Sequence, residues 1–303
     1  MIKVEGLTKK FGNFLAVDNI SFNVKPGEIF GFLGPNGAGK TTTIRIMASL
    51  ISPSSGKVQV EGREISENAQ YIRSIIGILT ESPGLYERMS AYENLLYFAG
   101  FYNIEKLKIA SNIEKFLKMF GLWERRNEMV AAYSKGMKQK LAISRALIHE
   151  PKILFLDEPT AGLDPESAYM VRNFIESLRN NNTTVFLCTH NLEEAQVLCS
   201  TICIIKTRII KTASVYELQN SSNLKTFELV TLDEPSFFEN ILKKFGPQLD
   251  YSIEGNKVFL KINDFQMTNP ALIKDLAAAG IKITAFNEIK ESLEDIYLKL
   301  IRA

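Results

Sequence analysis

The chain has 303 residues, of which 46% are hydrophobic and 23% are charged, as in an ordinary soluble globular protein of one or two domains. Lys and Arg number 36 and Asp and Glu number 34. This near balance argues against a dedicated nucleic-acid-binding protein and against an acidic tail. No apolar run approaches the roughly 18 residues that a membrane-spanning helix needs, so we expect no transmembrane segment. We expect the cysteines, Cys188, Cys199 and Cys203, to be reduced structural residues.

Strand patterns alternate with helical patterns along the first two-thirds of the chain. Residues 2–24 predict two strands joined by a turn at residues 11–13, and further strand patterns lie at residues 29–33, 57–62, 75–79, 153–156 and 184–188. Apolar residues three and four apart predict helices from residue 90 to about 148, and Asp164 with Pro165 predicts another helix. This order predicts an α/β fold with a mostly parallel sheet, antiparallel N-terminal strands and an inserted helical subdomain at about residues 86–148.

The last third of the chain is organised differently. A polar stretch rich in Ser and Asn reaches Asn223 and predicts a domain boundary, so we expect a first domain at residues 1–217 and a small α+β accessory domain at residues 224–303. In the second domain the sequence predicts a hairpin at residues 251–262, a helix that begins at Asn269 and Pro270, and a last helix capped by Ser292 and Asp295.

The segment from Gly34 to Thr42, GPNGAGKTT, has the spacing of a phosphate-binding P-loop and lies between a predicted strand and a predicted helix. Glycines let successive backbone N–H groups turn toward phosphate oxygens. Lys40 adds a positive charge at the β- and γ-phosphates, and the Thr41 hydroxyl can bind Mg²⁺. The helix that follows points its positive dipole end at the same place. The motif alone fits kinases, GTPases and many ATPases.

Adjacent carboxylates end the predicted strand at residues 153–156. Asp157 lies where a P-loop protein holds Mg²⁺ opposite the loop. Glu158 is placed to orient or deprotonate the water that attacks the γ-phosphate. On its own, a pair of acids at a strand end is as typical of a solvated turn.

Residues Tyr133 to Met137, with the segment ILFLDEPTAGLD and the tripeptide CTH, resemble the ATP-binding cassette (ABC) family, and the resemblance covers about residues 2–217. The family signature usually has the order Leu-Ser-Gly-Gly-Gln. Ser134 and Gly136 keep its second and fourth positions, whereas Tyr133, Lys135 and Met137 depart from it. A serine hydroxyl and a glycine at a helix N-terminus, both suited to an anion, are retained. By itself this pentapeptide is equally typical of an ordinary N-capped helix.

The resemblance implies which residues hold the nucleotide. Phe11 would stack on adenine, in a position where the family more often has tyrosine. The residues that would contact the phosphates are Gly34, Asn36, Gly37, Gly39, Lys40, Thr41 and Thr42.

The resemblance also implies roles in hydrolysis. Asp157 would hold Mg²⁺, Glu158 would be the catalytic base, and His190 would contact the γ-phosphate and support the attacking water. Asp164 would lie in the loop that communicates across a dimer of cassettes.

Glu81 stands where the family usually has glutamine. A carboxylate can still bind Mg²⁺, directly or through water, but it cannot donate an amide hydrogen bond, and it adds negative charge near the phosphates. We therefore expect Mg²⁺ binding to depend more on charge, and we expect Glu81→Gln to retain substantial ATPase activity.

In the family, ATP is sandwiched between two cassettes, and the P-loop of one faces the signature of the other. The resemblance thus implies ATP and Mg²⁺ as cofactors and a homodimer or heterodimer, in which Ser134 and Gly136 complete a site on the partner cassette. It also implies an integral membrane permease subunit as partner, a location at the cytoplasmic face of the membrane, and no nucleic acid.

Two short segments, Ser82 to Ser90 and Glu291 to Tyr297, resemble the cassettes of ABC-2-type exporters, which include drug and antibiotic-resistance transporters. Three alternatives stay open: a cassette of an importer, a soluble ABC ATPase of DNA repair or translation, and a small-molecule P-loop kinase. The second would need a zinc module, a long coiled-coil insertion or a second cassette, and the third would not need the signature.

Overall fold

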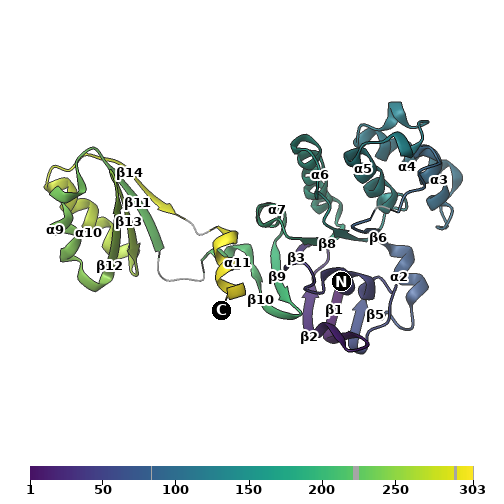
Figure 1. Ribbon diagram of the computed structural model, residues 1–303, viewed down its shortest axis with the longest axis horizontal. Helices are drawn as coiled ribbons and strands as arrows, with labels where there is room; N and C mark the ends of the chain where they lie inside the picture. Colours follow the sequence, from purple (N-terminus) through teal and green to yellow (C-terminus); the bar gives the residue numbers. More distant parts are fainter. Residues whose placement is uncertain (83, 221–224, 290–291, 303) are drawn as a thin grey trace. The chain divides into compact units, whose positions relative to one another are not determined.

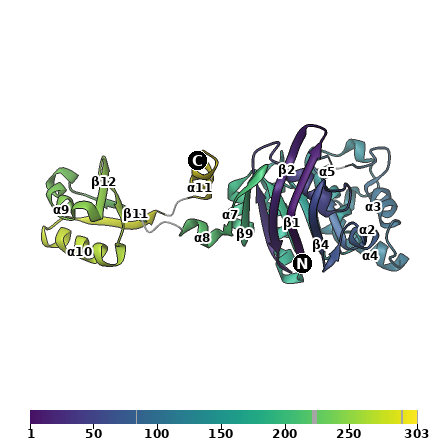
Figure 2. The same ribbon diagram turned by 90° about the horizontal axis from the view of Figure 1, so that it is seen from below.

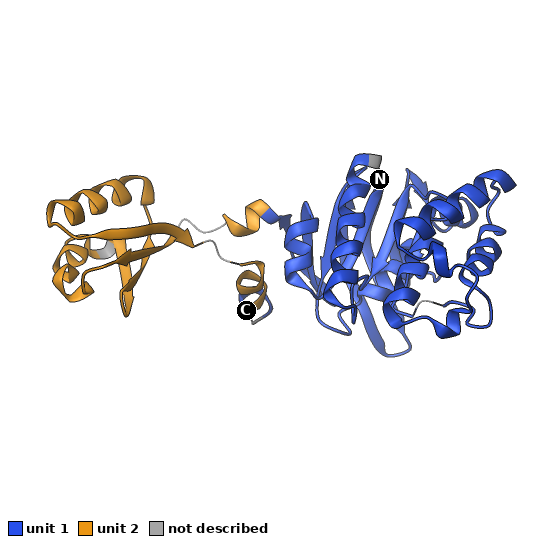
Figure 3. Cartoon of the chain, turned by 90° about the horizontal axis from the view of Figure 1, so that it is seen from above, with its two compact units in different colours: residues 1–215, 299–303 blue, residues 216–298 orange. Residues whose placement is uncertain are grey.

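The computed structural model describes residues 1–82, 84–220, 225–289 and 292–302. The chain divides into two compact units, shown in different colours in Figure 3: residues 1–215 with 299–303, and residues 216–298. Part of the predicted domain boundary, residues 221–224, lies outside the described residues, as do Pro83 and Glu291 of the segments that resemble exporter cassettes.

A six-stranded sheet forms the centre of the first unit, with the order β10-β9-β3-β8-β7-β6 (Figure 1). Its strands are β3 (Ile29–Leu33), β6 (Ile76–Leu79), β7 (Ile153–Asp157), β8 (Thr184–Thr189), β9 (Thr201–Lys206) and β10 (Arg208–Ser214). The strands from β9 to β6 pair in parallel, and only β10 is antiparallel to its neighbour. The central strands β3, β7 and β8 are buried along their whole length, which explains their nearly continuous apolar sequences.

A second, antiparallel sheet of four strands has the order β2-β1-β4-β5, and Figure 2 shows β1, β2 and β4 side by side. Its strands are β1 (Ile2–Phe11), β2 (Phe14–Val24), β4 (Ser55–Val60) and β5 (Arg63–Glu64). One apolar core joins the two sheets. At its centre the ring of Phe22 lies 5.5 Å from both Phe30 and Phe32, and Phe186 lies 5.1 Å from Phe32. The predicted α/β fold with antiparallel N-terminal strands is confirmed.

Some helices of the first unit pack against these sheets, and others form a separate group. They are α1 (Lys40–Met47), α2 (Ala69–Ile75), α3 (Ala91–Ala99), α4 (Lys106–Met119), α5 (Lys135–Leu147), α6 (Pro165–Ser177) and α7 (Leu192–Leu198), with α8 (Val215–Gln219) beginning at the last residue of the 1–215 segment. Helices α3, α4 and α5 cluster together beyond β6 in Figure 1 and form the helical subdomain. Ser90 and Glu93 form a capping box that fixes the start of α3.

The second unit is a small α+β fold with its own apolar core. Its antiparallel sheet has the order β12-β13-β11-β14, with strands β11 (Lys225–Thr231), β12 (Leu249–Glu254), β13 (Lys257–Ile262) and β14 (Ile283–Ile289). Helices α9 (Glu239–Lys244) and α10 (Phe265–Ala278) contribute Leu242, Leu272 and Leu276 to the core. The last helix is α11 (Leu293–Arg302).

The predicted start of α10 is wrong, whereas the predicted cap of α11 is confirmed. Helix α10 begins at Phe265, because the Asp264 side chain accepts a hydrogen bond from the Met267 N–H (3.4 Å), and Pro270 lies inside the helix. Pro270 lacks a backbone N–H and so leaves one hydrogen bond of the helix unmade, but the cap at Asp264 and not the proline sets the start of α10. At α11, the Asp295 N–H donates to Ser292 Oγ (3.1 Å), and the Ser292 N–H donates to Asp295 Oδ2 (3.3 Å).

Within the described residues, no helix is both long and apolar enough to cross a membrane. Cys188, Cys199 and Cys203 are free and buried. Burial raises the pKa of the Cys203 thiol to about 12 and also raises the pKa of Cys188 and Cys199, so all are held as neutral thiols.

Candidate active site

The candidate site lies at the carboxyl ends of the parallel strands β3, β7 and β8. A cavity of about 490 Å³ opens there, as expected for an α/β sheet whose ligands bind beyond the carboxyl ends of its strands. Of the predicted residues, those that line it are Asn36, Gly37, Gly39, Lys40, Thr41, Thr42, Glu81, Asp157, Glu158 and His190. The structure therefore brings together residues from four separate parts of the sequence.

The loop between β3 and α1 needs glycine at defined places. A Cβ on Gly34 would lie 2.3 Å from the Ile205 carbonyl oxygen, and a Cβ on Gly39 would lie 2.5 Å from the Ala16 carbonyl oxygen. Gly39 also has a φ of 100°, which L side chains rarely adopt. These glycines let the loop turn tightly, so that the N-terminus of α1 faces the cavity.

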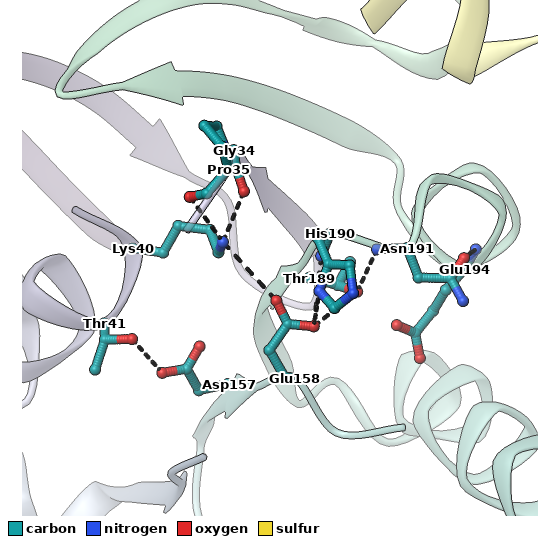
Figure 4. A network of polar contacts seen from close by, with 10 residues as sticks. All are labelled: Gly34, Pro35, Lys40, Thr41, Asp157, Glu158, Thr189, His190, Asn191 and Glu194. Carbon is teal, nitrogen blue, oxygen red and sulfur yellow. Dashed lines mark hydrogen bonds and ion pairs between the residues drawn. The ribbon is translucent and has the colours of Figure 1, made fainter. Parts of the chain in front are cut away.

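Lys40, the first residue of α1, is buried within this loop. Its ammonium donates hydrogen bonds to the carbonyl oxygens of Gly34 (2.7 Å) and Pro35 (3.3 Å) and lies 3.8 Å from Glu158 Oε1 (Figure 4). A phosphate held by the backbone N–H groups of the loop would meet this charge directly.

Thr41 and Asp157 form an oxygen-rich pair on the floor of the site. The Thr41 hydroxyl donates to Asp157 Oδ2 at 2.6 Å. Asp157 is only 2% exposed, and burial raises the pKa of its carboxyl group, against the opposing effect of the Thr41 hydrogen bond. The charges of Glu158 and Glu81 raise this pKa further, and Lys40 lowers it. A hard cation bound beside Asp157 would relieve this electrostatic cost, and hydroxyl and carboxylate oxygens are the ligands that Mg²⁺ prefers.

Glu158 is held tightly although it follows the end of β7. Its backbone has a φ of 52°, an uncommon value for a residue other than glycine, and its N–H donates to the Cys188 carbonyl oxygen (2.9 Å). Glu158 Oε2 lies 2.8 Å from His190 Nδ1 and accepts longer contacts from the Thr189 hydroxyl (3.5 Å) and the His190 N–H (3.4 Å). Oε1 is buried and has no hydrogen-bond partner within the described residues. His190 thus fixes Oε2, whereas Oε1, with only the Lys40 ammonium 3.8 Å away, can still accept a proton or a hydrogen bond.

The loop after β8 presents His190 to the cavity. The His190 side chain is 66% exposed, so Glu158 is what orients it. The Thr189 hydroxyl accepts a hydrogen bond from the Asn191 N–H (3.0 Å), and the Asn191 side chain caps α7 by accepting from the Glu194 N–H (3.0 Å). The loop is therefore fixed from both sides.

Phe11 and Phe14 face each other across the turn between β1 and β2. Phe14 lines the cavity. Phe11 is not among the lining residues; it is 49% exposed, and Lys9 Nζ lies 4.9 Å from the centre of its ring. Reasoning from the sequence missed Phe14, although its place three residues after Phe11, in a predicted hairpin, is a signal that could have found it.

Ser134, Gly136 and Asp164 do not line this cavity. Ser134 caps α5 by accepting from the Met137 N–H (3.2 Å), and Asp164 caps α6 by accepting from the Ser167 N–H (2.9 Å). A Cβ on Gly136 would lie 3.6 Å from Asp164 Oδ2, so the two helix starts are neighbours. These predicted residues form a second surface of the first unit.

Comparison with known proteins gives two family matches. Residues 17–161 match the model of the ABC transporter family, and residues 214–301 match the C-terminal domain of DrrA1-3-like ATP-binding proteins. The bacitracin transport ATP-binding protein BcrA of Enterococcus faecalis aligns over 306 residues with 34% identity, which covers 99% of this chain and 96% of that protein. The Nod factor export ATP-binding protein I of Cupriavidus metallidurans is 32% identical, with coverage of 99% and 97%.

A solved structure agrees with the first unit. The ATP-binding cassette MJ0796, in a dimeric post-hydrolysis state bound to ADP and Pi, superposes with a TM-score of 0.66 and 26% identity over 71% of this chain and 99% of that chain. The chain therefore belongs to the family of ABC transporter ATP-binding proteins, ATPases that bind ATP and power transport by hydrolysing it.

Proposed function

We propose that this chain is the ATP-hydrolysing subunit of an ABC-2-type exporter and acts at the cytoplasmic face of a membrane beside a separate permease subunit. The observation that carries the proposal is the alignment along the whole chain, second unit included, with proteins named for bacitracin transport and Nod factor export. A cassette shared with other transporters would account for the first unit alone.

The geometry supports a division of roles within the cavity. The P-loop and the start of α1 bind the phosphates, and Lys40 neutralises their charge. Thr41 and Asp157 would hold Mg²⁺, with Glu81 binding it directly or through water; the ion would draw charge from the phosphate oxygens. Glu158 Oε1 then accepts a proton or hydrogen bond from the attacking water, while His190 holds Oε2.

The proposal includes a second cassette, either another copy of this chain or a related one. Ser134, Gly136 and Asp164 stand at adjacent helix starts outside the cavity. A helix N-terminus with free backbone N–H groups favours an anion. We assign this surface to the γ-phosphate side of an ATP molecule held in the P-loop of the partner.

The exporter assignment can be tested by copurification from native membranes. The tagged chain, extracted in mild detergent with MgATP, is expected to bring down one integral membrane protein in a fixed ratio. A Lys40→Ala variant is the matched control, because permease contact does not need the P-loop lysine. Recovery of the chain in the cytosolic fraction with ribosomes or DNA, without a membrane protein, would contradict the assignment.

A further inference from the structure

Glu194, on α7, is a buried acid that the roles assigned above do not use. Its side chain is 1% exposed, and neither of its carboxylate oxygens has a hydrogen-bond partner within the described residues. A charged carboxylate in such a place is strongly disfavoured, whereas the neutral acid is tolerated. The structure therefore favours a protonated Glu194 close to the candidate catalytic residues.

The groups that face Glu194 come from the loops that carry the site. The hydroxyls of Thr189 and Thr160 and the charge of Arg172 on α6 lower its pKa, but burial, helped by the charge of Glu158, outweighs them and raises it. The charge of Glu194 also raises the pKa of the Cys199 thiol, which follows the end of α7. The charge of Glu158 acts on Glu194, so an ionised Glu194 would repel it.

The Thr189 hydroxyl contacts Glu158 and is one of the groups that face Glu194. In Figure 4, Glu194 lies beyond Thr189 and Asn191 as seen from Lys40. The Thr189 hydroxyl accepts from the Asn191 N–H at 3.0 Å and donates to Glu158 Oε2 at 3.5 Å, which is a long contact. Thr160 follows Glu158 by two residues in the loop that leads to Asp164. Glu194 thus faces a hydroxyl from each of the loops after β7 and β8.

We propose that Glu194 is a positioning residue which, as a neutral carboxylic acid, ties Thr189 to Thr160 and so holds Glu158 against His190. A protonated carboxyl group can donate one hydrogen bond and accept another, so it can engage both hydroxyls at once. The Thr189 hydroxyl is then oriented to donate to Glu158 Oε2. The proposal rests on the role of Glu158 proposed above.

Positioning is tested by comparing Glu194→Gln with Glu194→Leu. Gln keeps the volume, the neutrality and the ability to donate and accept, so its kcat is expected within about threefold of the unmodified protein. Leu cannot bind either hydroxyl, and its kcat is expected to fall by roughly 10- to 100-fold while the Kd for ATP changes little. Glu193, which is exposed in the same turn of α7, supplies the matched controls Glu193→Gln and Glu193→Leu, both expected to be unchanged. A Leu variant with full kcat, or a Gln variant as slow as Leu, would overturn the proposal.

The link through Thr189 is tested by a double-mutant cycle. Thr189→Val and Glu194→Leu are expected to lower kcat by similar factors, and the double variant should be no slower than the slower single one, because both remove the same support. Losses that multiply would contradict the link. Turnover of Glu158→Gln is measured alongside. If that variant is fully active, the proposed role of Glu158 fails, whereas the coupling of Glu194 to Thr189 is still decided by the cycle.

The neutral state is tested by folding stability against pH, without nucleotide. The folded pKa of Glu194 is raised above its unfolded value of about 4.3, so the folded state binds more protons in the window between the two values. The difference in the free energy of unfolding between the unmodified protein and Glu194→Gln is therefore expected to be smallest at the lowest pH. As pH rises through that window, the unmodified protein is expected to become less stable relative to the Gln variant. A difference that does not change with pH would overturn the neutral assignment, even if the Leu variant does not fold.

Discussion

At the scale of single residues, the site depends on which polar atoms are fixed and which are left free. Glu158 Oε2 is held by His190, whereas Oε1 is buried without a hydrogen-bond partner within the described residues and has the Lys40 ammonium 3.8 Å away. Lys40 is likewise fixed by carbonyl oxygens of its own loop. Such an arrangement has its groups in place before the substrate arrives, so little reorganisation is needed at the moment of reaction.

Glu81 provides a prediction at this scale. Glu81→Gln is expected to reduce ATPase turnover by less than about tenfold, on the order of 1.4 kcal/mol, because an amide oxygen can still bind Mg²⁺ and the variant removes one charge that raises the pKa of Asp157. Steady-state turnover at saturating MgATP measures this. Glu87→Gln, at an exposed position outside the cavity, is the control. A larger loss would show that the carboxylate itself is required.

The sequence predicted those site residues that local spacing defines. The P-loop, Asp157 and Glu158 each belong to a short segment in which a strand, a turn and a residue type occur together. Phe14 and Glu194 were missed for a different reason. Phe14 reaches the cavity through the register of the β1–β2 hairpin, and Glu194 is notable only because the fold buries it. The burial of Glu194 cannot be read from neighbouring residues in the chain, whereas the place of Phe14 three residues after Phe11 in a predicted hairpin was a usable signal.

At the scale of elements, the contact between α5 and β6 joins the helical subdomain to the central sheet. A Cβ on Gly77, in β6, would lie 2.1 Å from the carbonyl oxygen of Ala146, in α5. His149, just after α5, also contacts the Ile76 carbonyl oxygen through Nε2 at 2.9 Å. Both contacts involve backbone carbonyl oxygens, which cannot move aside as a flexible side chain can, so α5 and β6 have little room to adjust.

Gly77→Ala is therefore expected to lower the free energy of unfolding by about 1–3 kcal/mol, because the added methyl group forces α5 away from β6. Urea unfolding measures the change. Gly100→Ala is the matched control: Gly100 has an ordinary helical φ of −62°, and its Cβ would lie 3.2 Å from its nearest neighbour. Equal stability of the two variants would contradict the close contact.

The order of helices and strands was easier to predict from the sequence than the residues at which they begin. The alternation of strands and helices predicted the order of elements in the cassette, because long buried strands and capped helices have strong local patterns. The predicted start of α10 was wrong because Asp264 offers a cap five residues before Asn269, and the sequence does not show which of two possible starts packs better.

At the scale of the whole molecule, the chain combines a cassette with a smaller α+β unit. The sequence predicted both folds, since each has its own pattern and its own apolar core. The exact division was harder to predict, because residues 299–303 group with the first unit although they follow the second in sequence. The identity of the partner cassette likewise depends on the surfaces that meet, and the local sequence pattern does not reveal it.

In the function proposed here, a working ATP site joins the P-loop of one cassette to the Ser134 and Gly136 surface of another. The most direct test mixes two inactive variants of this chain, Lys40→Ala and Gly136→Asp. A Cβ on Gly136 has 3.4 Å or more to its neighbours, so the chain itself tolerates a side chain there. In a mixed dimer, one site keeps both an intact Lys40 and an intact Gly136.

Measured ATPase activity of an equal mixture is therefore expected to recover to about a quarter of the unmodified level, since half of the dimers are mixed and each has one intact site of two. Each variant alone is expected to stay inactive. Activity of the mixture no higher than the sum of the separate variants would contradict a site shared between two copies of this chain, and full activity of Gly136→Asp alone would contradict any role of the Gly136 surface.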